Sequence, residues 1–176
     1  MRCGRVFAFN PTATIRETMP TIHLTTFIAA PADRVFDLCR HIGLHTQTMA
    51  AFKEEAVAGT RFGLIGNDET VTWKARHVGK TRLLRVKVSD MKIPEQFVVE
   101  QAEGDFKAMR HEYYCKPCDN GTILVELFHF ETPYGQLGRW FNSIYLNRYL
   151  RKMLEQRNAT LREVAESDKW KKLLLV

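Results

Sequence analysis

Residues 121–136 read GTILVELFHFETPYGQ, and they contain the point at which a series of strands gives way to a helix. Gly121 marks a turn, and residues 122–132 have the length and composition of a β-strand. Pro133 and Gly135 end that strand, and residues 136–166 follow a helical repeat. A strand that leads directly into one long final helix is therefore the feature that decides the fold.

Further strand-like segments precede residue 121, at a spacing of about ten residues. Residues 71–77 alternate cleanly, and the segments at 84–88, from 97 onward and at 106–115 follow after turn signals at Gly79, Pro94 and Gly104. Closely spaced strands with turns between them predict an antiparallel meander.

The N-terminal part of the domain adds one strand and two helices. Residues 21–28 alternate as a strand, residues 29–33 open a helix, and a second short helix is expected from about Gly43 to Met49. The complete pattern predicts an α+β domain. In it, a curved antiparallel sheet of six or seven strands wraps around a long C-terminal helix, with two short helices after the first strand.

Three segments are expected along the chain. Residues 19–166 form the domain, and residues 1–18 are a poorly ordered extension or precede a natural start at Met19. The tail, residues 167–176, ends in four apolar residues and has no evident place in the core.

The long final helix carries two apolar stripes on nearly opposite sides. The first holds Leu137, Trp140, Phe141 and Ile144, and the second holds Leu146, Tyr149, Leu150, Met153, Leu154, Leu161 and Val164. One straight helix on one sheet does not bury both stripes. We therefore expect a bend near Ser143, or a first stripe that faces a pocket mouth, a partner or a membrane surface.

Composition excludes several classes of function. The net charge of the 176 residues is +6, but the Lys and Arg residues are dispersed, so we expect no nucleic-acid partner. No stretch approaches the roughly 20 apolar residues that span a bilayer, which leaves only peripheral membrane contact open.

The four cysteines suit a reducing compartment, and we expect a cytoplasmic protein. Cys115 and Cys118 form a C-x-x-C, but it enters a hairpin turn rather than a helix, and a second pair of zinc ligands is missing from the sequence. We expect neither a metal site nor a cofactor.

With these elements in place, the chain resembles the START-like helix-grip superfamily (SRPBCC, including the Bet v 1-like proteins). More narrowly, it is similar to bacterial ligand-binding proteins described as cell-division-inhibitor-like. The resemblance covers about residues 20–166, and its fragments are Ala30-Pro31, Val35-Phe36, residues 71–77, Pro94, Phe97, residues 104–106, residues 110–112, residues 133–138 and Arg157-Asn158.

Two positions depart from the family pattern. An H-x-H-x-F motif is common in these proteins, whereas this chain has His111-Glu112-Tyr113-Tyr114-Cys115, and Glu126 stands where an Asp is frequent. The resemblance implies a cavity between sheet and helix. It implies no reaction, because the superfamily hosts carriers, sensors, cyclases and hydrolases on one scaffold.

Strand parity brings several polar side chains to the face that we assign inward. On this face lie His77 and His111, and Glu126 shares the parity of neighbouring large apolar residues. The second stripe of the final helix contains Arg157, and a buried Arg is rarely left unpaired, so we expect it to pair with Glu126. The candidate ligand-binding residues are Trp73, His77, Phe97, Met109, His111, Tyr113, Glu126, Phe128 and Arg157.

These residues admit more than one role. They contact the polar head of a ligand, or they form a hydrogen-bonded network that only maintains strand register. The residues Trp140, Phe141 and Ile144 are a candidate gate or docking patch, against the alternative of ordinary packing.

The leading prediction is a carrier or sensor of a small lipophilic molecule, monomeric or weakly dimeric, with no catalytic residue assigned. The first alternative is a cyclase, dehydratase or hydrolase that uses the cavity His and Glu residues for acid–base chemistry. The second is an interaction module that acts through the candidate docking patch.

Overall fold

The computed structural model describes residues 19–77, 79–133 and 135–175, and it places their side chains except at 77 and 135–144. Its strands are β1 (Thr21–Ile28), β2 (Glu55–Gly59), β3 (Thr70–His77), β4 (Lys80–Lys92), β5 (Gln96–Glu103), β6 (Ala108–Cys118) and β7 (Gly121–Glu131). Its helices are α1 (Ala32–Cys39), α2 (Ile42–Thr48), α3 (Gly135–Glu166) and α4 (Lys171–Leu174), with short 3-10 turns η1 (Ala50–Phe52) and η2 (Asp168–Trp170).

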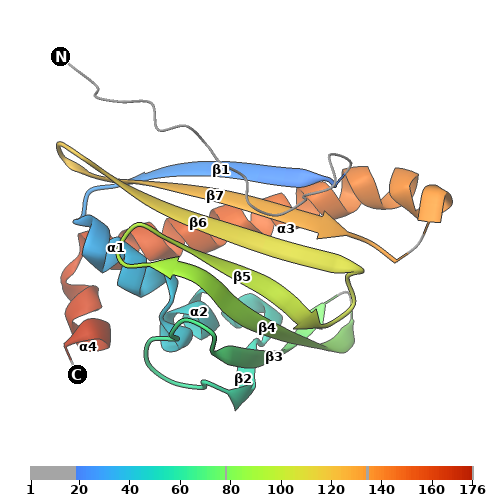
Figure 1. Cartoon of the computed structure of the whole chain (residues 1–176), viewed down its shortest axis with the longest axis horizontal. Helices are drawn as coiled ribbons and strands as arrows, with labels where there is room; N and C mark the ends of the chain where they lie inside the picture. Colours follow the sequence, from blue (N-terminus) through green and yellow to red (C-terminus); the bar gives the residue numbers. More distant parts are fainter. Residues whose placement is uncertain (1–18, 78, 134, 176) are drawn as a thin grey trace.

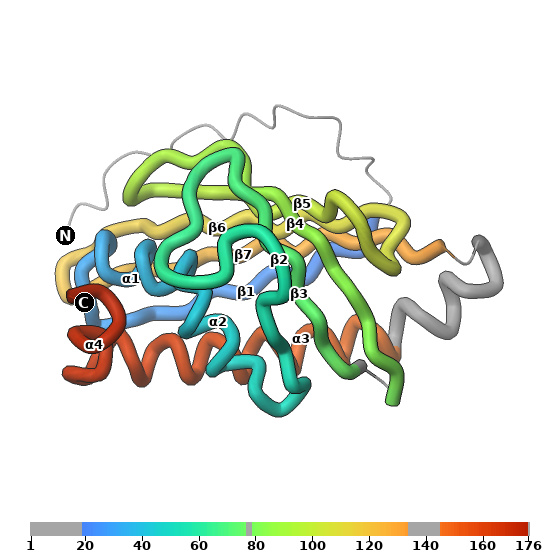
Figure 2. Tube along the Cα trace, turned by 90° about the horizontal axis from the view of Figure 1, so that it is seen from below, coloured from blue at the N-terminus to red at the C-terminus, as the bar shows by residue number. Residues whose placement is uncertain are grey.

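The described strands form one antiparallel sheet in the order β1-β7-β6-β5-β4-β3-β2. Strands β2 to β7 are neighbours in sequence order, and β1 pairs with β7 at the far edge. The sheet curls, and α3 runs along its concave side with α1 and α2 between them (Figures 1 and 2). This is the predicted α+β architecture, with seven strands and a helix gripped by the sheet.

The core follows from the alternation of side chains along each strand. On β7, Leu124, Glu126, Phe128 and Phe130 are buried on the concave side. The second stripe predicted for the final helix faces them, since Leu150, Leu154, Leu161 and Val164 are buried and Leu146, Tyr149 and Met153 pack against the core. The first stripe and the bend near Ser143 lie outside the described side chains.

The C-terminal tail packs against the domain, contrary to the expectation that it has no place in the core. The side chains of Trp170, Leu173 and Leu174 are partly buried against the core. The guanidinium of Arg34, on α1, lies 4.1 Å from the centre of the Trp170 ring. The turn at η2 folds the chain back from the end of α3, so that α4 covers α1 (Figure 1).

Strand β2 has no counterpart among the strands that the sequence predicts. None of its five residues is fully buried, and its pairing with β3 is shifted by an irregularity at Ala56 and Ala58. An edge strand without a buried face does not need alternating apolar and polar residues, so its sequence carries no strand pattern. Among the described helices, none combines the length and apolar character needed to cross a membrane.

Candidate functional site

A cavity of about 690 Å³ lies between the concave side of the sheet and α3. Pockets of this size enclose small organic ligands, and apolar and aromatic side chains make up most of its wall. Aromatic residues in the wall include Trp73, Phe97, Phe106, Tyr113, Phe128, Tyr145 and Tyr149. The helix therefore closes over the sheet without filling the space beneath it.

Most of the predicted ligand-binding residues reach this cavity. The wall contains Trp73, Phe97, Met109, His111, Tyr113, Phe128 and Arg157. Glu126 is not among the lining residues, because it lies behind the wall with 1% of its surface exposed. The side chains of His77, Trp140, Phe141 and Ile144 lie outside the described set.

Glu126 is the centre of a buried polar cluster. Arg157 Nη1 donates a hydrogen bond to Glu126 Oε1 at 2.8 Å, and Asn158 Nδ2 donates to Oε2. His111 Nε2 lies 3.1 Å from Oε1, although its orientation leaves it without a well-aligned hydrogen-bond partner among the described residues. Two adjacent residues of α3 thus hold both oxygens of a carboxylate on β7.

The cluster reaches the cavity through His111 and Tyr113. The Tyr113 hydroxyl lies 2.9 Å from His111 Nδ1, and Arg157 lies 5.0 Å from the centre of the Tyr113 ring. Burial lowers the pKa of His111 despite the nearby Glu126 carboxylate, so the ring is neutral at pH 7. With its Nε2–H toward Glu126, Nδ1 accepts a hydrogen bond from Tyr113.

The charge state of Glu126 follows from its partners. Burial by itself raises the pKa of this carboxyl, but the Arg157 charge and the contacts with His111 and Asn158 outweigh burial and hold the pKa at about 2. Glu126 is therefore ionised at pH 7 and fully engaged inside the protein. That state suits a residue that positions its neighbours and not one that exchanges protons with a ligand.

The lowered pKa of Glu126 predicts a loss of stability in acid. A carboxyl whose pKa is depressed by folding stabilises the protein above its unfolded pKa, near 4.5, and this contribution is lost as pH falls toward 2. We expect the free energy of unfolding to fall by about 2 kcal/mol from this group between pH 5 and pH 3. Urea unfolding at both pH values, compared with Glu126→Gln, measures it. An equal fall in both proteins would contradict this assignment.

A second polar pair in the wall was missed from the sequence. His45 Nε2 lies 2.9 Å from Glu54 Oε1, and both residues line the cavity. The fold positions them separately: His41 caps α2 by accepting a hydrogen bond from the Leu44 amide at 3.1 Å, and His45 follows one turn later. Glu54 comes from the loop after η1, which no periodicity connects to α2.

The sequence did carry one signal for His45. His41, His45 and Met49 are spaced by four residues, which places them on one face of a helix, and all three line the cavity. The nine-residue separation of His45 and Glu54 gives no comparable indication.

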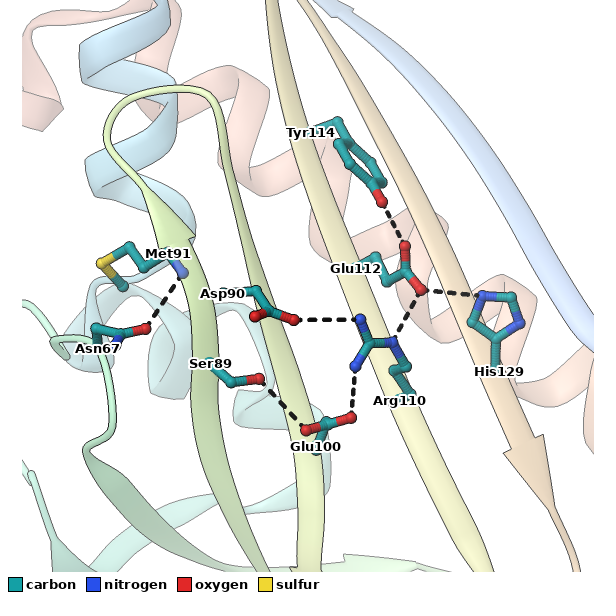
Figure 3. A network of polar contacts seen from close by, with 9 residues as sticks. All are labelled: Asn67, Ser89, Asp90, Met91, Glu100, Arg110, Glu112, Tyr114 and His129. Carbon is teal, nitrogen blue, oxygen red and sulfur yellow. Dashed lines mark hydrogen bonds and ion pairs between the residues drawn. The ribbon is translucent and has the colours of Figure 1, made fainter. Parts of the chain in front are cut away.

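A third polar network lies on the opposite, convex side of the sheet (Figure 3). Arg110 contacts the carboxylates of Glu112, Glu100 and Asp90, with Nε 2.9 Å from Glu112 Oε1. Glu112 is buried and also accepts a hydrogen bond from Tyr114. Because Arg110 and Glu112 alternate with the cavity-lining residues of β6, this network joins strands and does not contact the cavity.

We expect Arg110→Met to lower the free energy of unfolding by about 1–2 kcal/mol, because it leaves the buried Glu112 carboxylate without its cation. The matched control is Arg85→Met, whose pair with Glu103 is solvent-exposed and is worth less than about 1 kcal/mol. Urea denaturation of both variants gives the comparison. Similar losses in the two proteins would show that the network is no stronger than a surface pair.

The C-x-x-C motif does not act as a unit in the fold. Cys115 is buried and contacts Cys39 of α1, whereas Cys118 is exposed. The hydrogen bond with Cys115, together with burial, raises the pKa of the Cys39 thiol well above its usual range. A protonated, buried thiol is a poor nucleophile, so this pair acts as part of the core.

Comparisons with known proteins rest on structure. No family model matches the chain, and no curated protein matches its sequence. A solved structure of TTHA0849 from Thermus thermophilus superposes with a TM-score of 0.67 at 19% identity, covering 82% of this chain and 95% of that one.

Two further structures are similar. A START superfamily protein from Mycobacterium smegmatis has a TM-score of 0.61 at 16% identity, covering 83% of this chain and 97% of its own. The Zhui aromatase/cyclase from Streptomyces sp. R1128 has a TM-score of 0.59 at 16% identity, covering 83% and 96%. At these identities the likeness establishes the fold alone, and this chain has the helix-grip fold that these structures share.

Proposed function

We propose that the chain binds a small lipophilic molecule in the cavity between the sheet and α3, as a carrier or sensor. The observation that carries the proposal is the cavity of about 690 Å³ with its apolar and aromatic wall. Such a space is unfavourable to leave empty and poorly suited to water, whereas an apolar ligand fills it favourably. The likeness to a START superfamily protein supports the same function.

The expected affinity can be estimated from the apolar surface area that a ligand buries. A ligand that buries about 300 Å² of apolar surface gains roughly 7 kcal/mol at 25 cal/mol per Å². Association and ordering cost several kcal/mol, which leaves roughly 3–4 kcal/mol and binding in the millimolar range from apolar burial alone. Polar groups in the wall therefore decide selectivity, and Tyr113 and His111 are the groups that the Glu126 cluster holds in place.

The enzymatic alternative draws on the likeness to an aromatase/cyclase. Against it, the Glu126 carboxylate is held ionised by Arg157 and Asn158, and burial raises the pKa of Tyr113. Neither group is suited to proton transfer near pH 7. The interaction-module alternative depends on Trp140, and a stable dimer lost on Trp140→Ala would support it.

Two measurements test the proposal. Native mass spectrometry of freshly purified protein is expected to show a bound small molecule that is released on denaturation. After extraction with organic solvent and refolding, the protein is expected to bind one molecule of 2-methoxynaphthalene, a small apolar probe, in a saturable titration. A protein that carries nothing and shows no saturable binding of this probe would contradict the proposal.

A further inference from the structure

The pair formed by His45 and Glu54 has a geometry that the Glu126 cluster lacks. Glu54 is 8% exposed, and its carboxylate accepts the hydrogen bond of His45 Nε2 at 2.9 Å. The His45 ring packs on Trp73, with ring centres 4.4 Å apart. A carboxylate on one side and an indole ring against its face hold this imidazole in one orientation.

This arrangement determines which nitrogen of His45 is available. A carboxylate only accepts hydrogen bonds, so the 2.9 Å contact with Glu54 assigns a proton to Nε2. In the tautomer that carries its proton on Nε2, Nδ1 has a free lone pair. No described residue donates a hydrogen bond to Nδ1, and the ring lines the cavity. His45 thus brings a potential hydrogen-bond acceptor to the group of residues that line the cavity.

The chemistry of the wall restricts what donates to that acceptor. A carboxylate or an ether has no proton to give. An ammonium group loses its hydration in an apolar cavity, at a cost that one neutral acceptor does not offset. A hydroxyl group is small and neutral, and it makes the hydrogen bond at little desolvation cost.

The remaining surface favours a flat apolar body. Rings of Trp73, Phe97 and Tyr113 face the same cavity, and Phe97 and Tyr113 stack with centres 4.4 Å apart. Aromatic side chains offer faces and edges that pack against a planar ring system. We propose that His45 and Glu54 form a hydroxyl-recognition subsite, and that the ligand is a planar aromatic molecule whose hydroxyl group donates to His45 Nδ1. This inference rests on the proposed cavity binding and adds the class of ligand.

A matched pair of probes separates the two proposals. 2-Naphthol and 2-methoxynaphthalene have the same ring system, and only the first has a hydroxyl proton. We expect the wild-type protein to bind 2-naphthol about three- to tenfold more tightly, the size of one net hydrogen bond. If both probes bind equally, the cavity function stands and the subsite is refuted. If neither binds, the cavity function itself fails.

Two variants assign the preference to the pair. His45→Phe keeps a ring against Trp73 but has no acceptor, so its ratio of affinities for 2-naphthol and 2-methoxynaphthalene is expected to fall to about one. Circular dichroism and thermal unfolding of the variant show whether it is folded. In Glu54→Gln the side-chain amide pairs with Nε2 either as acceptor or as donor, so the ring proton is divided between Nε2 and Nδ1 and the preference for 2-naphthol is expected to fall about two- to threefold.

A spectroscopic measurement provides an independent test. In protein labelled with ¹⁵N at histidine, the Nδ1 signal of His45 is expected to shift on addition of 2-naphthol and to remain in place with 2-methoxynaphthalene. His23, on the exposed side of β1, serves as the internal control. A preference for 2-naphthol that persists in His45→Phe would overturn the assignment. A His45 Nδ1 chemical shift that changes with neither probe would also overturn it.

Discussion

Replacement of Arg157 by methionine is expected to lower the free energy of unfolding by about 3–5 kcal/mol. Methionine roughly preserves the volume of the side chain but leaves the Glu126 carboxylate, 1% exposed, without its cation. A buried charge that loses its partner keeps its full desolvation cost. Chemical denaturation followed by circular dichroism measures the loss.

The same helix supplies the control. Arg151 pairs with Glu155 at 3.9 Å on the surface of α3, and Arg151→Met should change stability by less than about 1 kcal/mol. The double variant Glu126→Met/Arg157→Met removes both charges, so its loss should be smaller than the sum of the two single losses. Equal effects of Arg157→Met and Arg151→Met would refute the central place that we give to the cluster.

Filling the cavity is expected to abolish binding without unfolding the protein. Ala75 lies on β3 with its side chain in the wall, and a phenylalanine ring there occupies the space of a ligand ring. We expect Ala75→Phe to weaken 2-methoxynaphthalene binding by at least about 100-fold, equal to about 2.7 kcal/mol. Its stability should change by less than about 1 kcal/mol, whereas overpacking a filled core costs about 1–3 kcal/mol.

Lys74→Phe is the matched control, because the neighbouring side chain is half exposed and belongs to the other parity of β3. It introduces the same ring outside the cavity and should leave probe affinity unchanged. An Ala75→Phe protein that binds the probe normally would contradict the location of the site. A strongly destabilised one would show that the space at Ala75 is already packed.

The fold was predictable because alternation and helical spacing report directly on burial. Strand β1 was predicted with its observed bounds, since Ile22, Leu24 and Ile28 face the core in strict alternation. Strand β2 was not predicted, because an exposed, irregular edge strand has no alternation of buried and exposed residues. The packing of Trp170 on Arg34 was not predicted either, because it depends on a turn at η2 that brings distant segments together.

The contact between Glu126 and Arg157 was predictable for the same reason as the core. Each residue lies on an apolar face, and a buried ion needs a partner, so parity and helical spacing together point to the pair. The contact between His45 and Glu54 was not predictable, because Glu54 is placed by a 3-10 turn and by Lys53 in a left-handed backbone conformation. Sequence periodicity carries no information on such a loop.

The most direct test of the cavity is a crystal structure of the protein grown with 2-methoxynaphthalene. The account predicts electron density for the probe beneath α3, in contact with Trp73, Phe97 and Phe128, with the sheet still curved around it. A structure in which side chains fill this space, and the probe is absent or lies on the outer surface, would contradict it.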